Sequence, residues 1–120
     1  MPKRIMIVDD DREYTRLFHQ MLDHLGHDIV EVTNGAEVYR RLMTESFDLV
    51  LLDYKMRDVR GDLVCEIIRS EDRLKNIPLI MVTGHRELDK DFFKTIGASD
   101  VLYKPLERAQ LVDTVEKYLS

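Results

Sequence analysis

Four short apolar runs of this sequence each lead into a side chain that can take part in chemistry. Asp9 and Asp10 follow the first run, Asp53 follows the second, Thr83 the third and Lys104 the fourth. A carboxylate at the end of a buried strand contributes little to packing, but it can bind or react with a ligand. If the four runs form parallel strands, all of these groups lie at one edge of one sheet, where ligands of open α/β sheets bind.

Together these side chains suit a phosphoryl group. Crowded carboxylates raise one another's pKa unless a positive charge intervenes, and a divalent cation such as Mg²⁺ relieves that repulsion. An ammonium group adds positive charge, and a hydroxyl can donate to an anionic oxygen. Asp53 stands alone at its strand end, so it is the best candidate for a nucleophile that forms an aspartyl phosphate. The pair Asp9 and Asp10 is better suited to hold the metal.

The elements that must position these groups follow from the alternation of apolar runs with amphipathic segments. That alternation predicts an α/β fold on a parallel sheet, with strands near residues 5–8, 29–32, 47–53, 79–83 and 101–103. Between them, apolar residues recur at spacings of three and four, which indicates five helices. The predicted apolar faces are Tyr14, Leu17, Phe18, Met21, Leu22 and Leu25; Val38, Tyr39, Leu42 and Met43; Leu63, Val64, Ile67 and Ile68; Leu88, Phe92, Phe93 and Ile96; and Leu111, Val112, Val115, Tyr118 and Leu119. Gly26 and Gly97 are predicted to end the first and fourth helices.

Composition limits the class of protein. The chain has 120 residues, 44% of them hydrophobic and 34% charged, which predicts one folded domain over residues 1–120. No apolar stretch is long enough to span a membrane, and we expect no signal peptide, because the N-terminal Met1-Pro2-Lys3-Arg4 leads directly into the first strand. The single Cys65 fits a reducing cytoplasm. A net charge of −5 without a basic stripe argues against direct binding of nucleic acid.

The conjunction of these motifs resembles the receiver domain of two-component response regulators, of the chemotaxis-regulator kind, over nearly the whole chain. The resemblance rests on four segments in order: Val8-Asp9-Asp10-Asp11, Leu52-Asp53 with Met56 and Gly61 downstream, Thr83-Gly84, and Lys104-Pro105-Leu106. It implies a single doubly wound, flavodoxin-like (βα)5 domain with strand order 2-1-3-4-5.

By this resemblance, Asp53 accepts a phosphoryl group from a sensor histidine kinase or a histidine phosphotransfer protein. Asp10 and Asp53 bind Mg²⁺ or Mn²⁺ together with the backbone carbonyl of Lys55, and Asp9 acts through water. The protein is then a signalling module and not an enzyme, although it catalyses its own phosphorylation and dephosphorylation.

The same resemblance assigns Thr83 and Lys104 to the phosphoryl oxygens and to relaying the signal. It places the surface for an unknown output partner, or for a homodimer, on the fourth helix, fifth strand and fifth helix. No membrane partner is expected.

The sequence departs from the family's pattern at three positions. Receivers usually carry Tyr or Phe three residues before the lysine, where this chain has Val101; Tyr103 shares the face of Val101 on a strand but lies next to Lys104. Output is therefore predicted to rely on displacement of the loop after Thr83 and of the fourth helix. Arg57 replaces a frequent proline, which adds a backbone donor. Lys55 borders the route of an attacking water, where it could pair with the phosphoryl group or with Asp9.

Other interpretations stay open at this point. A degenerate receiver would act as a constitutive docking module. A small aspartyl-phosphate phosphatase of the haloacid dehalogenase type would need a second acid two residues after the nucleophile, and Lys55 occupies that place. Asp9 and Asp10 could cap the first helix, as Asp11 is expected to do. The four histidines have no metal-ligand spacing, and Cys65 is expected in the core.

Overall fold

Five parallel strands form one sheet in the order β2-β1-β3-β4-β5 in the computed structural model, which describes residues 2–120. They are β1 (Arg4–Val8), β2 (Asp28–Val32), β3 (Leu49–Asp53), β4 (Leu79–Thr83) and β5 (Asp100–Tyr103). The predicted parallel sheet and the strand order implied by the resemblance are both confirmed. In the register, Val8 lies beside Leu52, Asp53 beside Val82, and Thr83 beside Tyr103, so the carboxyl ends of four strands meet at one edge.

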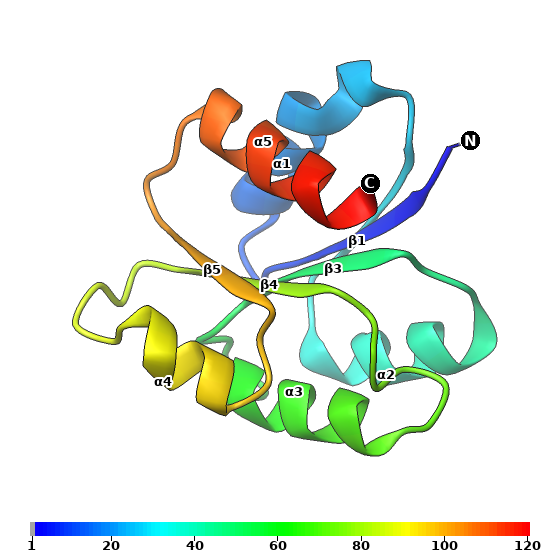
Figure 1. Cartoon of the computed structure of the whole chain (residues 1–120), viewed down its shortest axis with the longest axis vertical. Helices are drawn as coiled ribbons and strands as arrows, with labels where there is room; N and C mark the ends of the chain where they lie inside the picture. The colour runs from blue at the N-terminus through cyan, green and yellow to red at the C-terminus, as the bar shows by residue number, and fades with distance from the viewer. Residues whose placement is uncertain (1) are drawn as a thin grey trace.

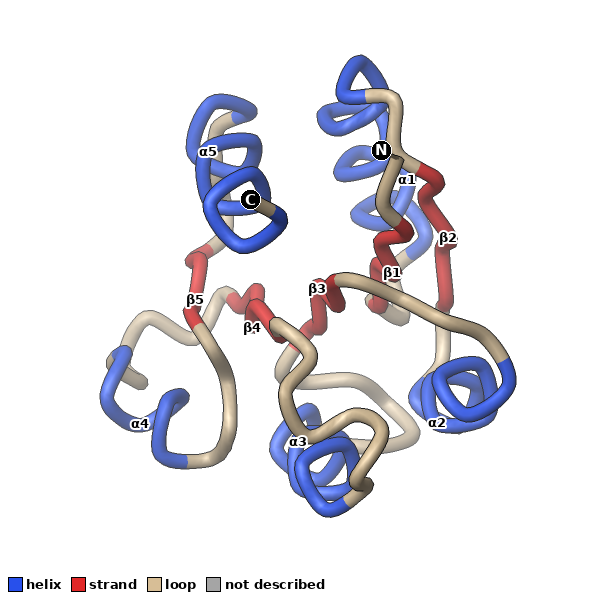
Figure 2. The backbone as a smooth tube through the Cα atoms, turned by 45° about the vertical axis from the view of Figure 1, so that its right-hand side comes forward, coloured by secondary structure: helices blue, strands red, loops and turns tan. Residues whose placement is uncertain are grey.

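Five α-helices cover the two faces of the sheet (Figures 1 and 2). Helices α1 (Arg12–Leu22) and α5 (Arg108–Leu119) lie on one face, and α2 (Gly35–Thr44), α3 (Gly61–Ser70) and α4 (Lys90–Thr95) lie on the other. A short 3₁₀ turn, η1 (Asp23–Leu25), extends α1. The strict alternation of strands and helices is therefore confirmed, with one added turn.

Local chemistry explains where the helices begin and end. Asp11, Asn34 and Asp89 are N-caps whose side chains accept hydrogen bonds from backbone amides in the first turns of α1, α2 and α4. Gly26 has φ 78° and Gly97 has φ 117°, the left-handed region that glycine tolerates best. Gly26 ends the 3₁₀ turn after α1, and Gly97 follows α4, so both predicted ends are close to correct.

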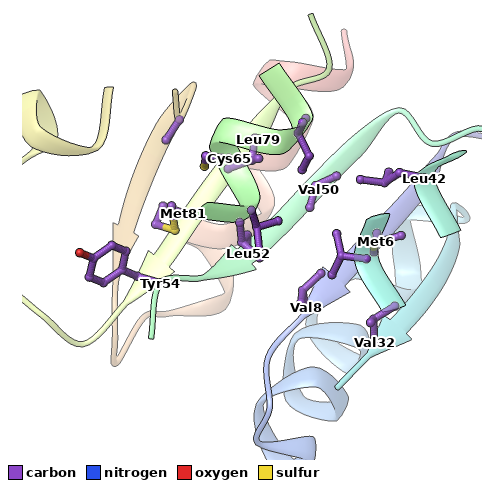
Figure 3. Close-up of a cluster of buried hydrophobic side chains, with 14 of the residues drawn as sticks. Met6, Val8, Val32, Leu42, Val50, Leu52, Tyr54, Cys65, Leu79 and Met81 are labelled. Carbon is purple, nitrogen blue, oxygen red and sulfur yellow. The ribbon is translucent and has the colours of Figure 1, made fainter. Parts of the chain in front are cut away.

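Each face of the sheet has its own apolar core. The larger cluster lies under α2, α3 and α4, and Figure 3 shows Met6, Val50 and Leu52 of the sheet with Leu42 and Cys65 of the helices. The smaller cluster packs α1 and α5 against the opposite face. Because successive residues of a strand point to opposite faces, each apolar run of the three central strands contributes to both clusters. Cys65 is buried, as expected.

The helical periodicity predicted more buried residues on the helices than the core contains. Leu17, Tyr39, Leu63 and Ile67 were expected on buried faces but are exposed. Leu88 precedes the cap Asp89, so it lies outside α4. The predicted faces were wider than the contact that each helix makes with the sheet. None of the helices in residues 2–120 is both long enough and apolar enough to span a bilayer.

Candidate functional site

The ends of β1 and β3 bring three carboxylates together. Asp9, Asp10 and Asp53 each offer an oxygen, and these oxygens lie within 4.8 Å of one another. Val8 and Leu52 belong to the cluster under α2–α4, so the residues that follow them, Asp9 and Asp53, turn toward the α1 and α5 face. Asp9 and Asp53 are buried and Asp10 is half-buried. The acids expected to meet at this edge therefore do so.

Lys104 supplies the positive charge of this cluster. Its Nζ lies 2.7 Å from Oδ2 of Asp9 and 3.5 Å from Oδ1 of Asp53, and the Lys104–Pro105 peptide bond is cis. Nζ also lies 3.9 Å from the ring centroid of Tyr14 in α1, which is cation–π geometry. Burial by itself would lower the pKa of Lys104, but the hydrogen bond to Asp9 and the charges of the two aspartates outweigh it and raise the pKa. The ammonium group is therefore charged at neutral pH.

Asp53 has an unusual acidity for an aspartate. Burial, followed by repulsion from Asp9, raises its pKa from the ordinary value of 3.8 to about 6, although Lys104 acts in the opposite direction. One ammonium group thus leaves part of the negative charge of three carboxylates uncompensated. A bound cation would relieve the remainder and keep Asp53 ionised, as a nucleophile requires.

The two N-terminal acids have different hydrogen-bond partners. The Oδ1 of Asp9 accepts from the backbone amide of Asp11 at 2.9 Å, and its Oδ2 accepts from Lys104. The Oδ2 of Asp10 accepts from the backbone amide of Arg57 at 2.9 Å. A proline at position 57 would lack this amide, so the hydrogen bond that holds the loop after Asp53 to Asp10 depends on Arg57 not being proline. Asp11 caps α1, as expected.

Thr83 reaches the same edge but not the acid cluster. It is fully buried at the end of β4, and its hydroxyl oxygen accepts a hydrogen bond from the backbone amide of His85 at 3.0 Å. Val82 packs in the cluster under α1 and α5, so strand alternation places Thr83 on the opposite side of the sheet from Asp53. Within the described residues, the Thr83 hydroxyl makes no hydrogen bond to Asp53 or Lys104.

The loop from Asp53 to Gly61 is tightly folded. The backbone amide of Gly61 donates to the carbonyl of Tyr54, and a Cβ at Gly61 would lie 2.9 Å from the carbonyl oxygen of Asp53. Glycine is therefore required for this close approach. Lys55 forms an antiparallel bridge with Arg60, and its side chain is exposed. The pairing of Lys55 with Asp9 is not observed, because Asp9 is bonded to Lys104.

An aromatic cluster links this loop to α4. Tyr54 is buried next to Asp53, and its ring meets those of Phe92 and Phe93 edge-on, with centroids 6.1 and 5.3 Å away. Val101 is buried in the same core, and Tyr103 lies on its face of β5, as expected. The hydroxyl of Tyr103 donates to the carbonyl of Leu88, which precedes α4.

Sequence reasoning missed two contributors to the site, Tyr14, which stacks on Lys104, and Tyr54. It foresaw the backbone donor at Arg57 but not its acceptor, Asp10. Tyr14 appeared only as one member of an apolar helical face. Its position about one helical turn after the acid pair was a usable signal, but the sequence does not show its contact with a residue far along the chain.

Comparisons with known proteins agree with this geometry. The family described as "Response regulator receiver domain" matches residues 5–116. The chain is 28% identical over 120 residues to the polar-differentiation response regulator DivK of Brucella anthropi, covering 99% of this chain and 98% of that protein. It is 33% identical over 118 residues to the transcriptional regulatory protein GltR of Pseudomonas aeruginosa, covering 98% of this chain but 49% of that protein.

Solved structures give the same result. A CheY-like response regulator receiver domain protein from Methanospirillum hungatei superposes with a TM-score of 0.89 at 27% identity, covering 99% of this chain and 94% of that chain. Receiver domains bind Mg²⁺ at an acidic pocket, and this chain has an acidic cluster of Asp9, Asp10 and Asp53. The chain therefore belongs to the response regulator receiver domains, modules whose general function is phosphorylation-dependent signalling.

Proposed function

We propose that residues 1–120 form one receiver domain that accepts a phosphoryl group on Asp53 from a sensor histidine kinase or a histidine phosphotransfer protein. A carboxylate oxygen of Asp53 forms the new bond to phosphorus while the bond from phosphorus to the donor imidazole nitrogen breaks. The observation that carries this proposal is the position of Asp53, with Lys104 3.5 Å away and Asp9 and Asp10 beside it. Asp53 is the only carboxylate of the cluster that belongs to β3.

Asp10 and Asp53 would hold Mg²⁺ or Mn²⁺, with the carbonyl of Lys55 as a third protein ligand. Asp9 would act through water, because its two oxygens already accept from Asp11 and Lys104. A bound divalent cation supplies charge compensation for the acids and for the phosphoryl oxygens. Lys104, which Asp9 and Tyr14 hold in position, would bind one phosphoryl oxygen. The chain would in this way assist its own phosphorylation and dephosphorylation.

The Thr83 hydroxyl would be drawn from the His85 amide to a second phosphoryl oxygen. Because Thr83 lies across the sheet from Asp53, this step requires the β4–α4 loop to move, and Tyr103 connects that loop to β5 through Leu88. We therefore assign the output surface, for a partner or for a homodimer, to α4, β5 and α5. The free, buried Cys65 supports a cytoplasmic location.

The phosphatase alternative receives no support from the position two residues after Asp53. There Lys55 presents an exposed ammonium group, and that enzyme class needs a carboxylic acid as proton donor. The degenerate receiver is the alternative that remains to be separated by experiment.

Intact mass spectrometry after incubation with Mg²⁺ and acetyl phosphate tests the proposal. We expect a mass gain of one phosphoryl group that is absent in Asp53→Asn and in protein treated with a chelator. Asp48→Asn, at the opposite end of β3, is the matched control and keeps the gain. A wild-type protein that stays unmodified by acetyl phosphate and by a panel of histidine kinases would establish the degenerate receiver instead.

A further inference from the structure

An open apolar groove runs between α2 and α3, on the face away from α1 and α5. Its volume is about 540 Å³. Val64 and Ile68 of α3 form its floor, Tyr39 of α2 and Ile67 of α3 form its walls, and Val59 from the loop after Asp53 closes one end. The acid cluster lies at the sheet edge and does not contribute to this lining.

Exposed apolar side chains lie in this groove and beside it: Tyr39 and Ile67 line it, and Leu63 lies next to it on α3. Four large hydrophobic residues are exposed in residues 2–120, and three of them are Tyr39 (41%), Leu63 (48%) and Ile67 (38%) on α2 and α3. Leu63 and Ile67 are four residues apart on α3, so they form one strip along the helix. Single exposed apolar residues are ordinary, but a contiguous group of them beside a groove marks an interaction site.

The charge around the groove is negative. Asp58 lies at the end near the sheet edge, where it accepts hydrogen bonds from the amides of Gly35 and Ala36, and Glu71 lies beyond the last turn of α3. Glu66 lies on the exposed side of α3, near Leu63. Among residues 2–120, no cationic side chain lies within 4.0 Å of the carboxylates of these three acids. The nearby Arg60 is paired with Asp62.

We propose that this groove docks an amphipathic helix of a partner protein, with apolar residues spaced three and four apart and lysines or arginines at its two ends. The apolar side chains would pack on Tyr39, Leu63 and Ile67, and the basic ends would meet Asp58 and Glu71. Helices lie in apolar grooves through such spaced anchors, and opposite charge at the rim fixes their register.

The same charges argue against other occupants. A second copy of this chain, docked by the same face, would bring its own Asp58, Glu66 and Glu71 against the first set. An anionic membrane surface would be repelled for the same reason. A basic helix is the occupant that both the apolar strip and its acidic rim favour.

The loop after Asp53 contacts both the groove and the acid cluster. Three consecutive loop residues make the connection: the amide of Arg57 donates to Asp10, Asp58 accepts from the first two amides of α2, and Val59 lines the groove. A Cβ at Gly35 would lie 1.9 Å from Cγ1 of Val59, so α2 can approach this loop only because residue 35 is glycine. The next expectation rests on the proposed function. Phosphorylation of Asp53 should change the free energy of helix binding, and helix binding should change the free energy of phosphorylation by the same amount, as linkage requires.

Docking itself is tested with unphosphorylated protein in a chelator, so the result does not depend on Asp53 accepting a phosphoryl group. The probe is a fluorescein-labelled synthetic helix of about four turns, with leucines three and four residues apart and lysines at both ends. We expect its anisotropy to report saturable binding to the wild type. Ile67→Lys should weaken that binding by at least about tenfold, whereas Leu17→Lys, at the exposed apolar residue of α1, should leave it unchanged. A peptide with the same leucines and glutamates in place of lysines should bind at least about tenfold more weakly.

The proposal is overturned if the lysine peptide does not bind, if Ile67→Lys and Leu17→Lys act alike, or if the two peptides bind equally. It is also overturned if sedimentation shows a wild-type dimer that Ile67→Lys dissociates, since the groove would then hold a second copy. Leu63→Ser, at the most exposed position of the strip, repeats the test without adding charge, and circular dichroism confirms that each variant is folded.

Discussion

The ends of β1 and β3 differ from the ends of β4 and β5 in how far their functional groups are already in contact. At β1 and β3, the carboxylates of Asp9, Asp10 and Asp53 are gathered, and the Lys104 side chain, although it follows β5, is bonded to the first of them and belongs to this group. At β4 and β5, Thr83 is bonded to the His85 amide, and Val101 is packed in the core where receivers usually carry an aromatic ring. The groups of the proposed phosphoryl site are thus already in contact, whereas the residues of the proposed relay are not in contact with them.

This difference indicates which part of the site can vary in sequence. Repulsion among buried carboxylates leaves few alternatives to a lysine and a cation, so the groups at β1 and β3 constrain one another. The proposed relay requires a contact between β5 and the loop before α4. Here Tyr103 supplies that contact through its hydroxyl, and Tyr54, Phe92 and Phe93 pack the loop after Asp53 against α4.

Replacing the lysine should have the largest effect on the groups of the proposed phosphoryl site. Lys104→Gln would leave the buried Asp9 carboxylate without the ammonium group that lies 2.7 Å away. We expect a loss of about 3 kcal/mol in the free energy of unfolding, measured with urea in a chelator, and a partial recovery when Mg²⁺ is added. Arg57→Ala is the control, because its side chain is 94% exposed and 3.8 Å from Asp10, and it should change stability by less than about 0.5 kcal/mol. A loss below about 1 kcal/mol in Lys104→Gln would contradict the idea that these groups are held together by charge.

Removing the Asp53 carboxylate should instead increase the free energy of unfolding. The pKa of Asp53 is raised from 3.8 to about 6 in the fold, so ionising this group costs free energy in the native state. That cost is absent below the unfolded pKa, grows as the pH rises toward 6, and is complete above it. Without metal, Asp53→Asn should therefore stabilise the protein near neutral pH by about 1 to 2 kcal/mol, after allowance for the solvated edge of the site. The gain should shrink as the pH falls through 6 and disappear near 4.

Thermal unfolding of both proteins across this pH range makes the measurement, and Mg²⁺ should reduce the difference at neutral pH by stabilising the wild type. A difference that is independent of pH would mean that Asp53 is not held in a repulsive environment.

In the proposed relay, loss of one hydroxyl should have a smaller effect. Tyr103→Phe removes the hydrogen bond to the Leu88 carbonyl and should cost about 1 kcal/mol. Amide exchange over the β4–α4 loop should quicken, and the change in that exchange on phosphorylation should diminish. Tyr118→Phe, which removes a hydroxyl bonded to Ser99 and Asp100 at the other end of β5, should leave the loop unaffected. Equal exchange in the two variants would remove Tyr103 from the relay.

The parts that the sequence predicted are those that depend on local pattern and chain topology. The alternation of apolar runs with amphipathic segments predicted parallel strands, and parallel strands that end in Asp53 and Thr83 bring these residues to one edge. The strand order needed the resemblance to receivers, because periodicity does not say which strands are neighbours. The roles of Asp53, Thr83 and Lys104 stay predictions, although Asp53 and Lys104 are now known to be adjacent.

The parts that escaped prediction depend on distances between segments far apart in the chain. Tyr14 and Lys104 meet only because α1 packs beside the end of β5. Ile67 has the same apolar character and spacing as the buried Ile68, and its exposure depends on how far α2 lies from α3. The added donor at Arg57 was foreseen, but its acceptor, Asp10, was not.

The smallest effect is expected at the side chain of Lys55, because the proposed metal site uses only the backbone carbonyl of this residue. Its side chain is exposed beside the mouth of the site, so Lys55→Ala should leave stability within about 0.5 kcal/mol of the wild type. If its ammonium group pairs with the phosphoryl group and obstructs an attacking water, the phosphorylated form should decay about threefold faster in the variant, which corresponds to less than 1 kcal/mol in the barrier. Decay is followed by intact mass after removal of acetyl phosphate. Lys75→Ala, at an exposed lysine before β4 and remote from the site, is the matched control, and equal decay in both variants would show that Lys55 does not set the lifetime of the signal.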